Sequence, residues 1–183
     1  ILKEGTEMPR GIVIFGANGC GKTTLGRELS RRLGCRHMDV EEYSFRDAEI
    51  PYSAPRPAEE RRVLMLRDMK RYGTFLLSAV NGDFGREINE MYRGAVYLSA
   101  PLSIRMDRIR RRSYEKFGDR VREGGDLFEQ ERAFWNFAAA RSLAALDEWA
   151  DTLRCPVIRV DASRPVQENA DHLAPICKEL LGL

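Results

Sequence analysis

Residues 11–34 read GIVIFGANGCGKTTLGRELSRRLG and carry three patterns in succession. The first five residues form a short apolar run rich in β-branched side chains, which predicts a strand buried on both faces. A glycine-rich turn follows, and after it leucines recur at every fourth position, so that they share one face of a helix. The chain is therefore expected to form a strand, a tight turn and a helix here.

The turn at residues 16–23, GANGCGKT, matches the pattern G-x-x-x-x-G-K-[ST] at every defined position and in the required strand–turn–helix setting. Glycines allow successive backbone N–H groups to point toward one centre, and the helix N-terminus adds about half a positive charge. Such a loop binds polyphosphate. The residues expected to contact a nucleotide here are Gly16, Asn18, Gly19, Cys20, Gly21, Lys22, Thr23 and Thr24.

The side chains of this loop have separate expected roles. Lys22 is expected to reach the β- and γ-phosphates of ATP, Thr23 to offer a hydroxyl to Mg²⁺, and Thr24 to contact the α-phosphate. Cys20 occupies a variable position of the pattern beside a helix N-terminus, which could lower the pKa of its thiol. The alternative for Cys20 is a residue that only fills space.

Composition narrows the class of protein. The chain has 183 residues, of which 43% are hydrophobic and 32% charged, which predicts one globular domain spanning residues 1–183. A formal net charge of +2 provides no global field for nucleic acid or an anionic membrane. No apolar run reaches the roughly 18–20 residues of a membrane span, and residues 1–10 lack the apolar core of a secretory signal. We therefore expect a cytoplasmic monomer or homodimer with neither a membrane nor a nucleic acid as partner.

The rest of the chain alternates between strand and helix patterns. Further strands are expected at 36–39, 74–80, 95–99 and 156–161. Helices are expected at 58–72, 103–113, 126–151 and 165–180, with a loop-like segment at 114–125. This alternation predicts a parallel sheet covered by helices on both faces, with ligands bound at the carboxyl ends of the strands.

The loop at 16–23, followed within about twenty residues by Met-Asp-Val-Glu-Glu at 38–42, resembles the start of the nucleoside monophosphate, shikimate and gluconate kinase superfamily. The resemblance implies a five-stranded parallel sheet of order 2-3-1-4-5 and the use of ATP and Mg²⁺. It also implies an acceptor-binding insert after the second strand and an arginine-bearing lid after the fourth. The candidate segments are about 43–60 for the insert and about 108–126 for the lid.

The lid candidate is strongly basic. Residues 104–123 contain eight Lys or Arg and four Asp or Glu, a local charge of +4. Guanidinium groups complement the charge that spreads over phosphoryl oxygens during transfer. Arg108 and Arg112, one helical turn apart, resemble the lid arginines best, with Arg120 next. The alternative is a solvated basic helix face.

A carboxylate at the end of the second expected strand, Asp39, lies beside the phosphate loop in this fold. By resemblance it either holds Mg²⁺ through water or orients an acceptor hydroxyl, and the alternative is a capping or surface carboxylate. Glu41 and Glu42 are weaker candidates for the same roles. The third expected strand ends without an acidic residue, so Asp83 in the turn after it is an alternative metal ligand.

Acceptor and base contacts are less distinct in the sequence. The insert supplies arginines and aromatic rings that suit an anionic or ring-bearing acceptor, namely Tyr43, Phe45, Arg46, Tyr52 and Arg56. The alternative for these residues is ordinary loop packing. Arg132 and Arg141 could point back toward that acceptor. The segment 161–165 resembles the loop around the adenine base, with Ser163 and Pro165 as contacts; on its own pattern, Ser163 is a helix N-cap before proline.

The sequence thus predicts an ATP- and Mg²⁺-dependent phosphotransferase that moves the γ-phosphoryl group to a small-molecule acceptor of the nucleotide, shikimate or gluconate kinase type. The expected catalytic residues are Lys22, Asp39, Arg108 and Arg112. The alternatives are a nucleotide-binding regulatory module without turnover and a nucleic-acid-associated ATPase.

Overall fold

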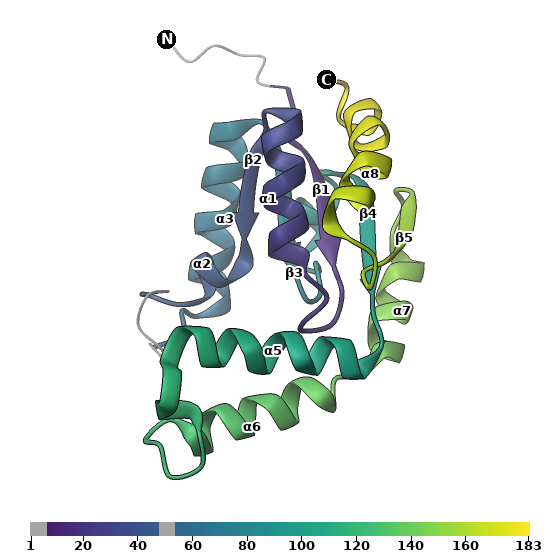
Figure 1. Cartoon of the computed structure of the whole chain (residues 1–183). Helices are drawn as coiled ribbons and strands as arrows, with labels where there is room; N and C mark the ends of the chain where they lie inside the picture. Colours follow the sequence, from purple (N-terminus) through teal and green to yellow (C-terminus); the bar gives the residue numbers. More distant parts are fainter. Residues whose placement is uncertain (1–6, 48–53) are drawn as a thin grey trace.

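The fold is built around five parallel strands in the order β2-β3-β1-β4-β5 (Figure 1). It is taken from a computed structural model that describes residues 7–47 and 54–183. The strands are β1 (Arg10–Phe15), β2 (Arg36–Asp39), β3 (Thr74–Ala79), β4 (Tyr92–Ser99) and β5 (Val157–Asp161). The order expected from the family resemblance is confirmed.

The central strand, β1, owes its place to its apolar run. Ile12 to Phe15 have no exposed surface, and β1 pairs with β3 on one side and β4 on the other. The Phe15 ring stacks on Tyr97 at a centroid distance of 4.5 Å and meets the edge of Trp149 at 4.7 Å. Burial of these rings fixes the carboxyl end of β1, where the phosphate loop begins.

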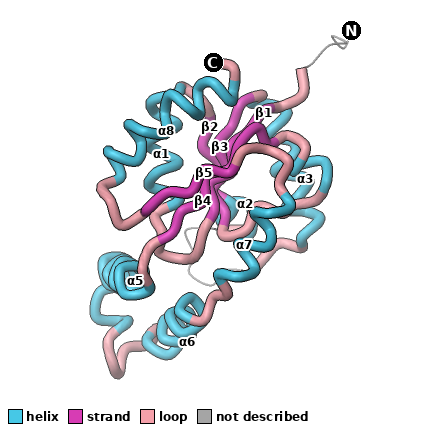
Figure 2. The backbone as a smooth tube through the Cα atoms, turned by 90° about the vertical axis from the view of Figure 1, so that its right-hand side faces the viewer, coloured by secondary structure: helices cyan, strands magenta, loops and turns pink. Residues whose placement is uncertain are grey.

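Helices cover both faces of the sheet (Figure 2). One face carries α1 (Lys22–Leu33) and α8 (Val166–Leu181), which pack against each other, and the other carries α3 (Ala58–Tyr72) and α7 (Leu143–Thr152). Two short helices, α2 (Val40–Ser44) and α4 (Arg86–Asn89), follow β2 and β3. Within the described residues, no helix is both long and apolar enough to cross a membrane.

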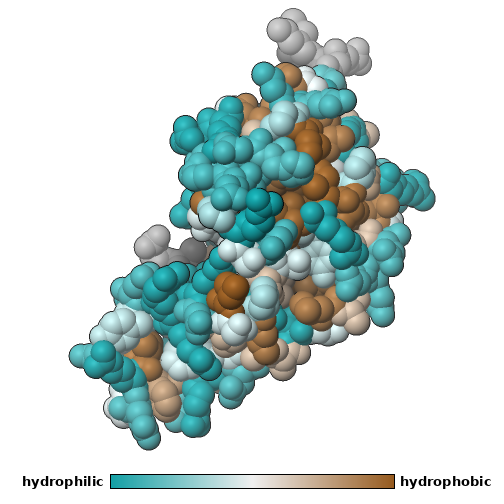
Figure 3. Space-filling view, turned by 45° about the vertical axis from the view of Figure 1, so that its right-hand side comes forward, coloured by the Kyte–Doolittle hydropathy of each residue, from teal (hydrophilic) through white to brown (hydrophobic). Residues whose placement is uncertain are grey.

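Two helices leave the body of the molecule side by side at the end of the sheet that bears the phosphate loop (Figures 1 and 2). They are α5 (Leu102–Phe117) and α6 (Phe128–Ala139), joined through a 3₁₀ helix, η1 (Gly118–Val121). We call residues 102–139 the arm. Its tip has a mostly hydrophilic surface (Figure 3).

The arm has a small core of its own, separate from the main one. Met106, Ile109 and Ala138 are its buried members. Beside them the Ser113 hydroxyl contacts the buried Glu131 carboxylate at 2.5 Å and accepts a 3.1 Å hydrogen bond from the Trp135 indole. Polar contacts of this kind, together with the apolar cluster, hold α5 and α6 to each other.

Two expectations about helices in this region were wrong. The helix expected at 126–151 is two helices, because the Ser142 hydroxyl accepts a hydrogen bond from the Ala145 N–H and starts α7 anew. The segment 114–125 is not simply a loop: α5 continues to Phe117, ends where Gly118 adopts a φ of 58°, and passes into η1. The apolar periodicity stays in phase across 140–142, so it could not reveal the break.

Candidate functional site

The phosphate loop, residues 16–23, lies tightly against the end of β4 and the start of α5. A Cβ atom on Gly16 would lie 2.3 Å from the Leu98 carbonyl oxygen, and one on Gly19 would lie 2.5 Å from that of Arg105. Both glycines also have positive φ values, 148° and 84°. Only glycine permits this close backbone approach, so the loop's curvature depends on both residues.

Lys22 points into the loop that precedes it. Its Nζ donates a 3.1 Å hydrogen bond to the Ala17 carbonyl oxygen. Burial lowers the pKa of Lys22 to about 8, and the positive charge of Arg112 acts in the same direction, while Asp39 opposes both. The ammonium therefore lies where a bound polyphosphate would provide the anionic partner that the loop itself lacks.

Thr23 and Asp39, from α1 and β2, meet beside this lysine. The Thr23 hydroxyl donates a 2.6 Å hydrogen bond to Oδ2 of Asp39, whose Oδ1 accepts from the Glu41 N–H at 3.1 Å and caps α2. Mg²⁺ prefers oxygen ligands and commonly takes only one or two from the protein, with phosphates and waters completing its shell. This hydroxyl and carboxylate fit such a metal.

The alternative metal ligand, Asp83, is engaged elsewhere. Its Oδ1 accepts from the Gly85 N–H at 3.2 Å and from the Asn89 side chain at 2.9 Å, and its own N–H donates to Asn81. These contacts make Asp83 part of the turn that leads into α4. Of the two carboxylates, the geometry favours Asp39.

Arginines at the start of the arm hold the phosphate loop by its carbonyl groups. Arg105, only 3% exposed, donates to the Asn18 carbonyl oxygen at 3.3 Å. Arg108 donates to the Gly19 carbonyl at 3.4 Å and to the Ala162 carbonyl at 2.9 Å. The sequence had singled out Arg108 but not Arg105, although its place one turn earlier on the same helix was a usable signal.

The other lid candidates differ from each other. Arg112 lines the pocket beside the loop, and its charge reaches Lys22. Arg120 instead forms a 2.7 Å ion pair with Asp126 at the tip of the arm. The structure thus brings Arg108 and Arg112 to the loop and leaves Arg120 away from it.

A pocket of about 530 Å³ opens next to the phosphate loop, a size suited to a nucleotide. It collects most of the residues expected to contact the base and phosphates, and these come from three separate segments. They include Gly19, Cys20, Gly21, Thr24, Arg108, Arg112, Ser163 and Pro165.

Two alternatives that the sequence left open at this pocket are not found, whereas the burial of Cys20 agrees with a residue that fills space. Ser163 does not cap α8: Pro165 occupies the N-cap, and the Ser163 hydroxyl and N–H both bond to Oδ1 of Asp161, at 2.6 and 2.9 Å. Cys20 is 3% exposed, and burial raises the pKa of its thiol despite the nearby cations. A lowered thiol pKa at the helix N-terminus is therefore not found.

On the other side of the loop, Arg141 turns toward Asn18. Its Nε donates a 3.3 Å hydrogen bond to the Asn18 side-chain oxygen, and its guanidinium stacks over the Phe137 ring at 4.7 Å. Arg141 and Phe137 line a hollow of about 280 Å³ together with Asn81. Arg132, the second arginine expected here, pairs with Glu129 instead.

Arg61 is a residue of this region that the sequence did not indicate. Its guanidinium stacks over the Phe84 ring at 5.3 Å, and its Nε is buried with no hydrogen-bond partner, the one such side-chain atom in the described part of the chain. An orphaned buried donor is costly unless a ligand satisfies it. In the sequence Arg61 lies within a run of charged helix residues, where nothing separates it from its exposed neighbours.

The insert's own arginines have structural roles. Arg56 donates to the carbonyl groups of Glu42, Tyr43 and Phe45, and Arg46 pairs with Glu60 at 3.2 Å. Of the three aromatic insert candidates, Tyr43 is buried and donates to Asp68 at 2.9 Å, Phe45 is exposed, and Tyr52 lies outside the described residues. Neither described arginine of the insert is directed at the phosphate loop by these contacts.

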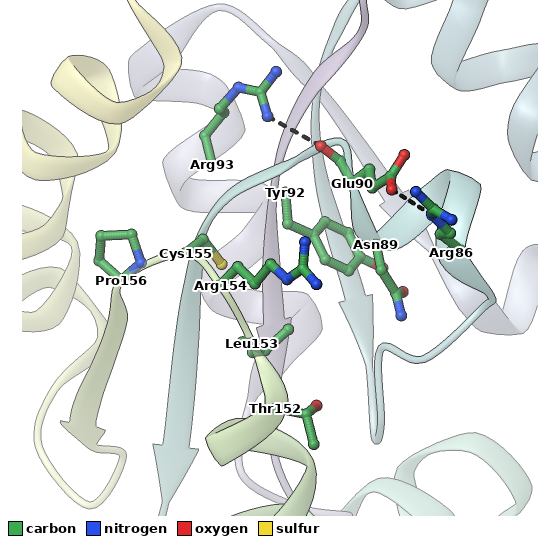
Figure 4. A pocket seen from close by; sticks show the side chains of 10 residues that line it. All are labelled: Arg86, Asn89, Glu90, Tyr92, Arg93, Thr152, Leu153, Arg154, Cys155 and Pro156. Atoms are coloured by element: carbon green, nitrogen blue, oxygen red, sulfur yellow. Dashed lines mark hydrogen bonds and ion pairs between the residues drawn. The ribbon is translucent and has the colours of Figure 1, made fainter.

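A second pocket, of about 810 Å³, lies at the opposite end of the sheet, where β4 and β5 begin (Figure 4). Glu90 occupies two of its arginines: Arg86 pairs with the carboxylate at 2.6 Å, and Arg93 donates to the backbone carbonyl at 3.0 Å. This pocket shares no residue with the phosphate loop, and three arginines against one glutamate leave its lining positively charged.

A family model described as AAA domain matches residues 12–133. The chain belongs to this family. The Bacillus subtilis uncharacterized protein YqaC is 31% identical to it over 174 residues, 91% of this chain and 96% of the relative. A shikimate kinase of Acinetobacter baylyi is 30% identical over 119 residues, 60% of this chain and 66% of that enzyme.

Solved structures of small-molecule kinases share the fold. A shikimate kinase from Acinetobacter baumannii in complex with shikimate has a TM-score of 0.54 at 18% identity, covering 96% of this chain and 95% of that one. A gluconokinase from Sinorhizobium meliloti has a TM-score of 0.53 at 14% identity, covering 96% and 95%. These neighbours show that this AAA-domain family member has the fold of P-loop small-molecule kinases.

Proposed function

We propose that this protein is an ATP- and Mg²⁺-dependent kinase that transfers the γ-phosphoryl group to a small anionic acceptor. The observation that carries the proposal is the 2.6 Å contact between Thr23 and Asp39 next to the Lys22 ammonium. A phosphate loop, a hydroxyl and a carboxylate at one edge of a parallel sheet are the elements that hold a metal-bound nucleotide. The kinase relatives support the same reaction class.

The chain's own residues would act by positioning and by charge. Loop N–H groups and Lys22 would hold the β- and γ-phosphates, while Arg108 and Arg112 approach from the arm. Thr23 and Asp39 would hold Mg²⁺, which neutralises phosphate charge when it is bound. Residues 108–126 would serve as the lid that excludes water during transfer.

An acceptor with negative charge is favoured by the cations on the far side of the loop. Arg141 lines a hollow that includes Asn81, and Arg61 stacks on Phe84, so both flank the segment 81–84 that follows β3. The unsatisfied Nε of Arg61 would gain its missing partner from a carboxylate or phosphate. About residues 43–60 are proposed as the acceptor-binding insert.

The function is tested by screening acceptors. Release of ADP from Mg-ATP would be measured with nucleoside monophosphates, sugars, sugar acids, shikimate and short oligonucleotides, with Lys22→Ala as the blank. We expect stimulation by an anionic small molecule, and a KM for it that rises at least about tenfold in Arg61→Ala and Arg141→Ala, because each removes a charge-assisted contact.

Other outcomes would replace the proposal. ATP binding without ADP release for any acceptor would indicate a regulatory module, and stimulation by oligonucleotides alone would indicate a nucleic-acid-associated ATPase. We further propose a cytoplasmic location, where ATP is available, and a monomer or homodimer.

A further inference from the structure

A cluster of one buried and one half-buried polar side chain lies directly behind the phosphate loop, where β2, β3 and α1 meet. The Ser78 hydroxyl, 1% exposed, donates a 3.1 Å hydrogen bond to the Lys22 carbonyl oxygen. Nε2 of His37 lies 2.8 Å from the same hydroxyl. These contacts join both strands to the first residue of the helix that follows the loop.

The direction of each hydrogen bond follows from the chemistry of the groups. A serine hydroxyl has one hydrogen, and a carbonyl oxygen can only accept. Because Ser78 donates to Lys22, the His37 ring must donate from Nε2 to Ser78. Burial lowers the pKa of His37, which agrees with a neutral ring in this position.

The backbone of α1 packs tightly against His37 and Ser78. A Cβ atom on Gly26 of α1 would lie 2.5 Å from the His37 ring and 2.8 Å from the Ser78 hydroxyl. The helix can therefore approach the two strands this closely only because residue 26 has no side chain. The hydrogen bonds from His37 to Ser78 and from Ser78 to Lys22, which we call the relay, thus fix the distance of α1 from β2 and β3.

The same hydrogen bonds set the spacing of the candidate metal ligands, Thr23 and Asp39. Asp39 lies two residues after His37 on β2 and is opposite Ser78 in the strand register. Thr23 follows Lys22 on α1. The relay therefore holds the backbone next to Thr23 against β2, the strand that carries Asp39, close to the 2.6 Å contact between these two residues.

We propose that His37 and Ser78 are positioning residues that hold Thr23 and Asp39 at the spacing required for Mg²⁺, and so raise the affinity for metal-bound nucleotide. This inference rests on the proposed use of Mg-ATP. It makes neither residue a catalytic one, since neither is placed in contact with nucleotide or acceptor.

The test compares nucleotide binding with and without the metal. Calorimetric binding of a non-hydrolysable ATP analogue would be measured across a Mg²⁺ titration and in EDTA, alongside thermal unfolding. We expect Ser78→Ala and His37→Leu to raise the Mg²⁺ concentration for half-maximal binding by about tenfold, the usual effect of losing a supporting contact around a metal. Affinity in EDTA should change less than about twofold, because the loop's own phosphate contacts remain.

Two variants separate positioning from mere stability. His37→Gln keeps a donor near the position of Nε2 and should restore most of the Mg²⁺ dependence. Ser30→Ala is the matched control, because Ser30 also lies on α1 and donates to a backbone carbonyl, that of Cys35 at 2.6 Å, but toward the far end of the helix. It should lower the melting temperature without shifting the Mg²⁺ requirement.

The outcomes are distinct. If Ser78→Ala and His37→Leu lower the melting temperature but leave the Mg²⁺ requirement of the wild type, the positioning role is wrong while the proposed function stands. If the wild type binds the analogue equally well with and without Mg²⁺, the proposed function itself fails. Should Ser78→Ala not fold, the comparison of His37→Leu with His37→Gln decides the same question.

Discussion

The Thr23 hydroxyl donates a hydrogen bond to the Asp39 carboxylate at 2.6 Å, across the gap between α1 and the edge strand β2. Sixteen positions separate these residues in the chain, and the sheet order places β3 between β2, which carries Asp39, and β1, which precedes α1. Two strands, β3 and β2, lie on this side of the phosphate loop. Among the described residues, only β2 ends in a carboxylate, and the contact joins the loop to it.

Asp39→Asn should raise the Mg²⁺ requirement of nucleotide binding or turnover by at least about tenfold, because it removes a negative oxygen from the metal's surroundings. Stability should change little, since asparagine caps a helix about as well as aspartate and can still accept from the Glu41 N–H. Asp83→Asn is the comparison, and its Mg²⁺ titration should match the wild type. The reverse pattern would transfer the metal to Asp83.

ATP affinity should depend on pH through Lys22, whose pKa is lowered to about 8 in the free protein. A bound polyphosphate stabilises the ammonium and raises this pKa, so binding takes up protons near pH 8 and weakens as pH rises further. Calorimetry in buffers of different ionisation enthalpy should show uptake of about half a proton per nucleotide at pH 8. Lys22→Arg should show none from this group, and equal uptake in that variant would contradict the assignment.

Arg108→Ala should weaken ATP binding and lower kcat/KM by about 10³-fold or more, the range found when an arginine that stabilises phosphoryl transfer is removed. The side chain also joins the Gly19 and Ala162 carbonyls, so the nucleotide pocket loses a brace. Arg120→Ala removes a similar charge from the arm but only an exposed ion pair with Asp126, and it should leave both constants nearly unchanged. Equal losses in the two variants would mean that only the arm's overall charge matters.

Ser142→Ala should lower the free energy of unfolding by about 1 kcal/mol, the usual cost of deleting a helix N-cap. The Ala145 N–H loses its acceptor, and the break between α6 and α7 becomes less well defined. Denaturant unfolding would measure the change. Ser142→Asp, which restores a capping oxygen, should recover most of it; if it does not, the hydroxyl contributes something other than a cap.

The parts that the sequence predicted best are those encoded locally. The apolar run before Gly16, the glycine pattern of the loop and the four-residue spacing of leucines together predict β1, the turn and α1, and α3 has the bounds that its spacing indicates. The strand order came from resemblance, since no local pattern specifies which strands pair.

The parts that the sequence could not predict depend on contacts between distant segments. Arg105 and Arg61 look like ordinary helix charges until the fold buries one against Asn18 and the other over Phe84. Ser163 carries a sound capping pattern, yet Asp161 competes for its hydroxyl and prevails. The role of Ser78 likewise appears only when β2 and α1 are placed beside it.

Asn18 accepts hydrogen bonds from arginines at both ends of the arm. Arg105, at the beginning of α5, donates to its carbonyl oxygen, and Arg141, just past α6, donates to its side-chain oxygen. Because α5 and α6 share a core, a rigid-body rotation of the arm would alter both hydrogen bonds at once. Asn18 would then couple the binding of nucleotide on one side of the loop to the binding of acceptor on the other, although the two substrates do not touch.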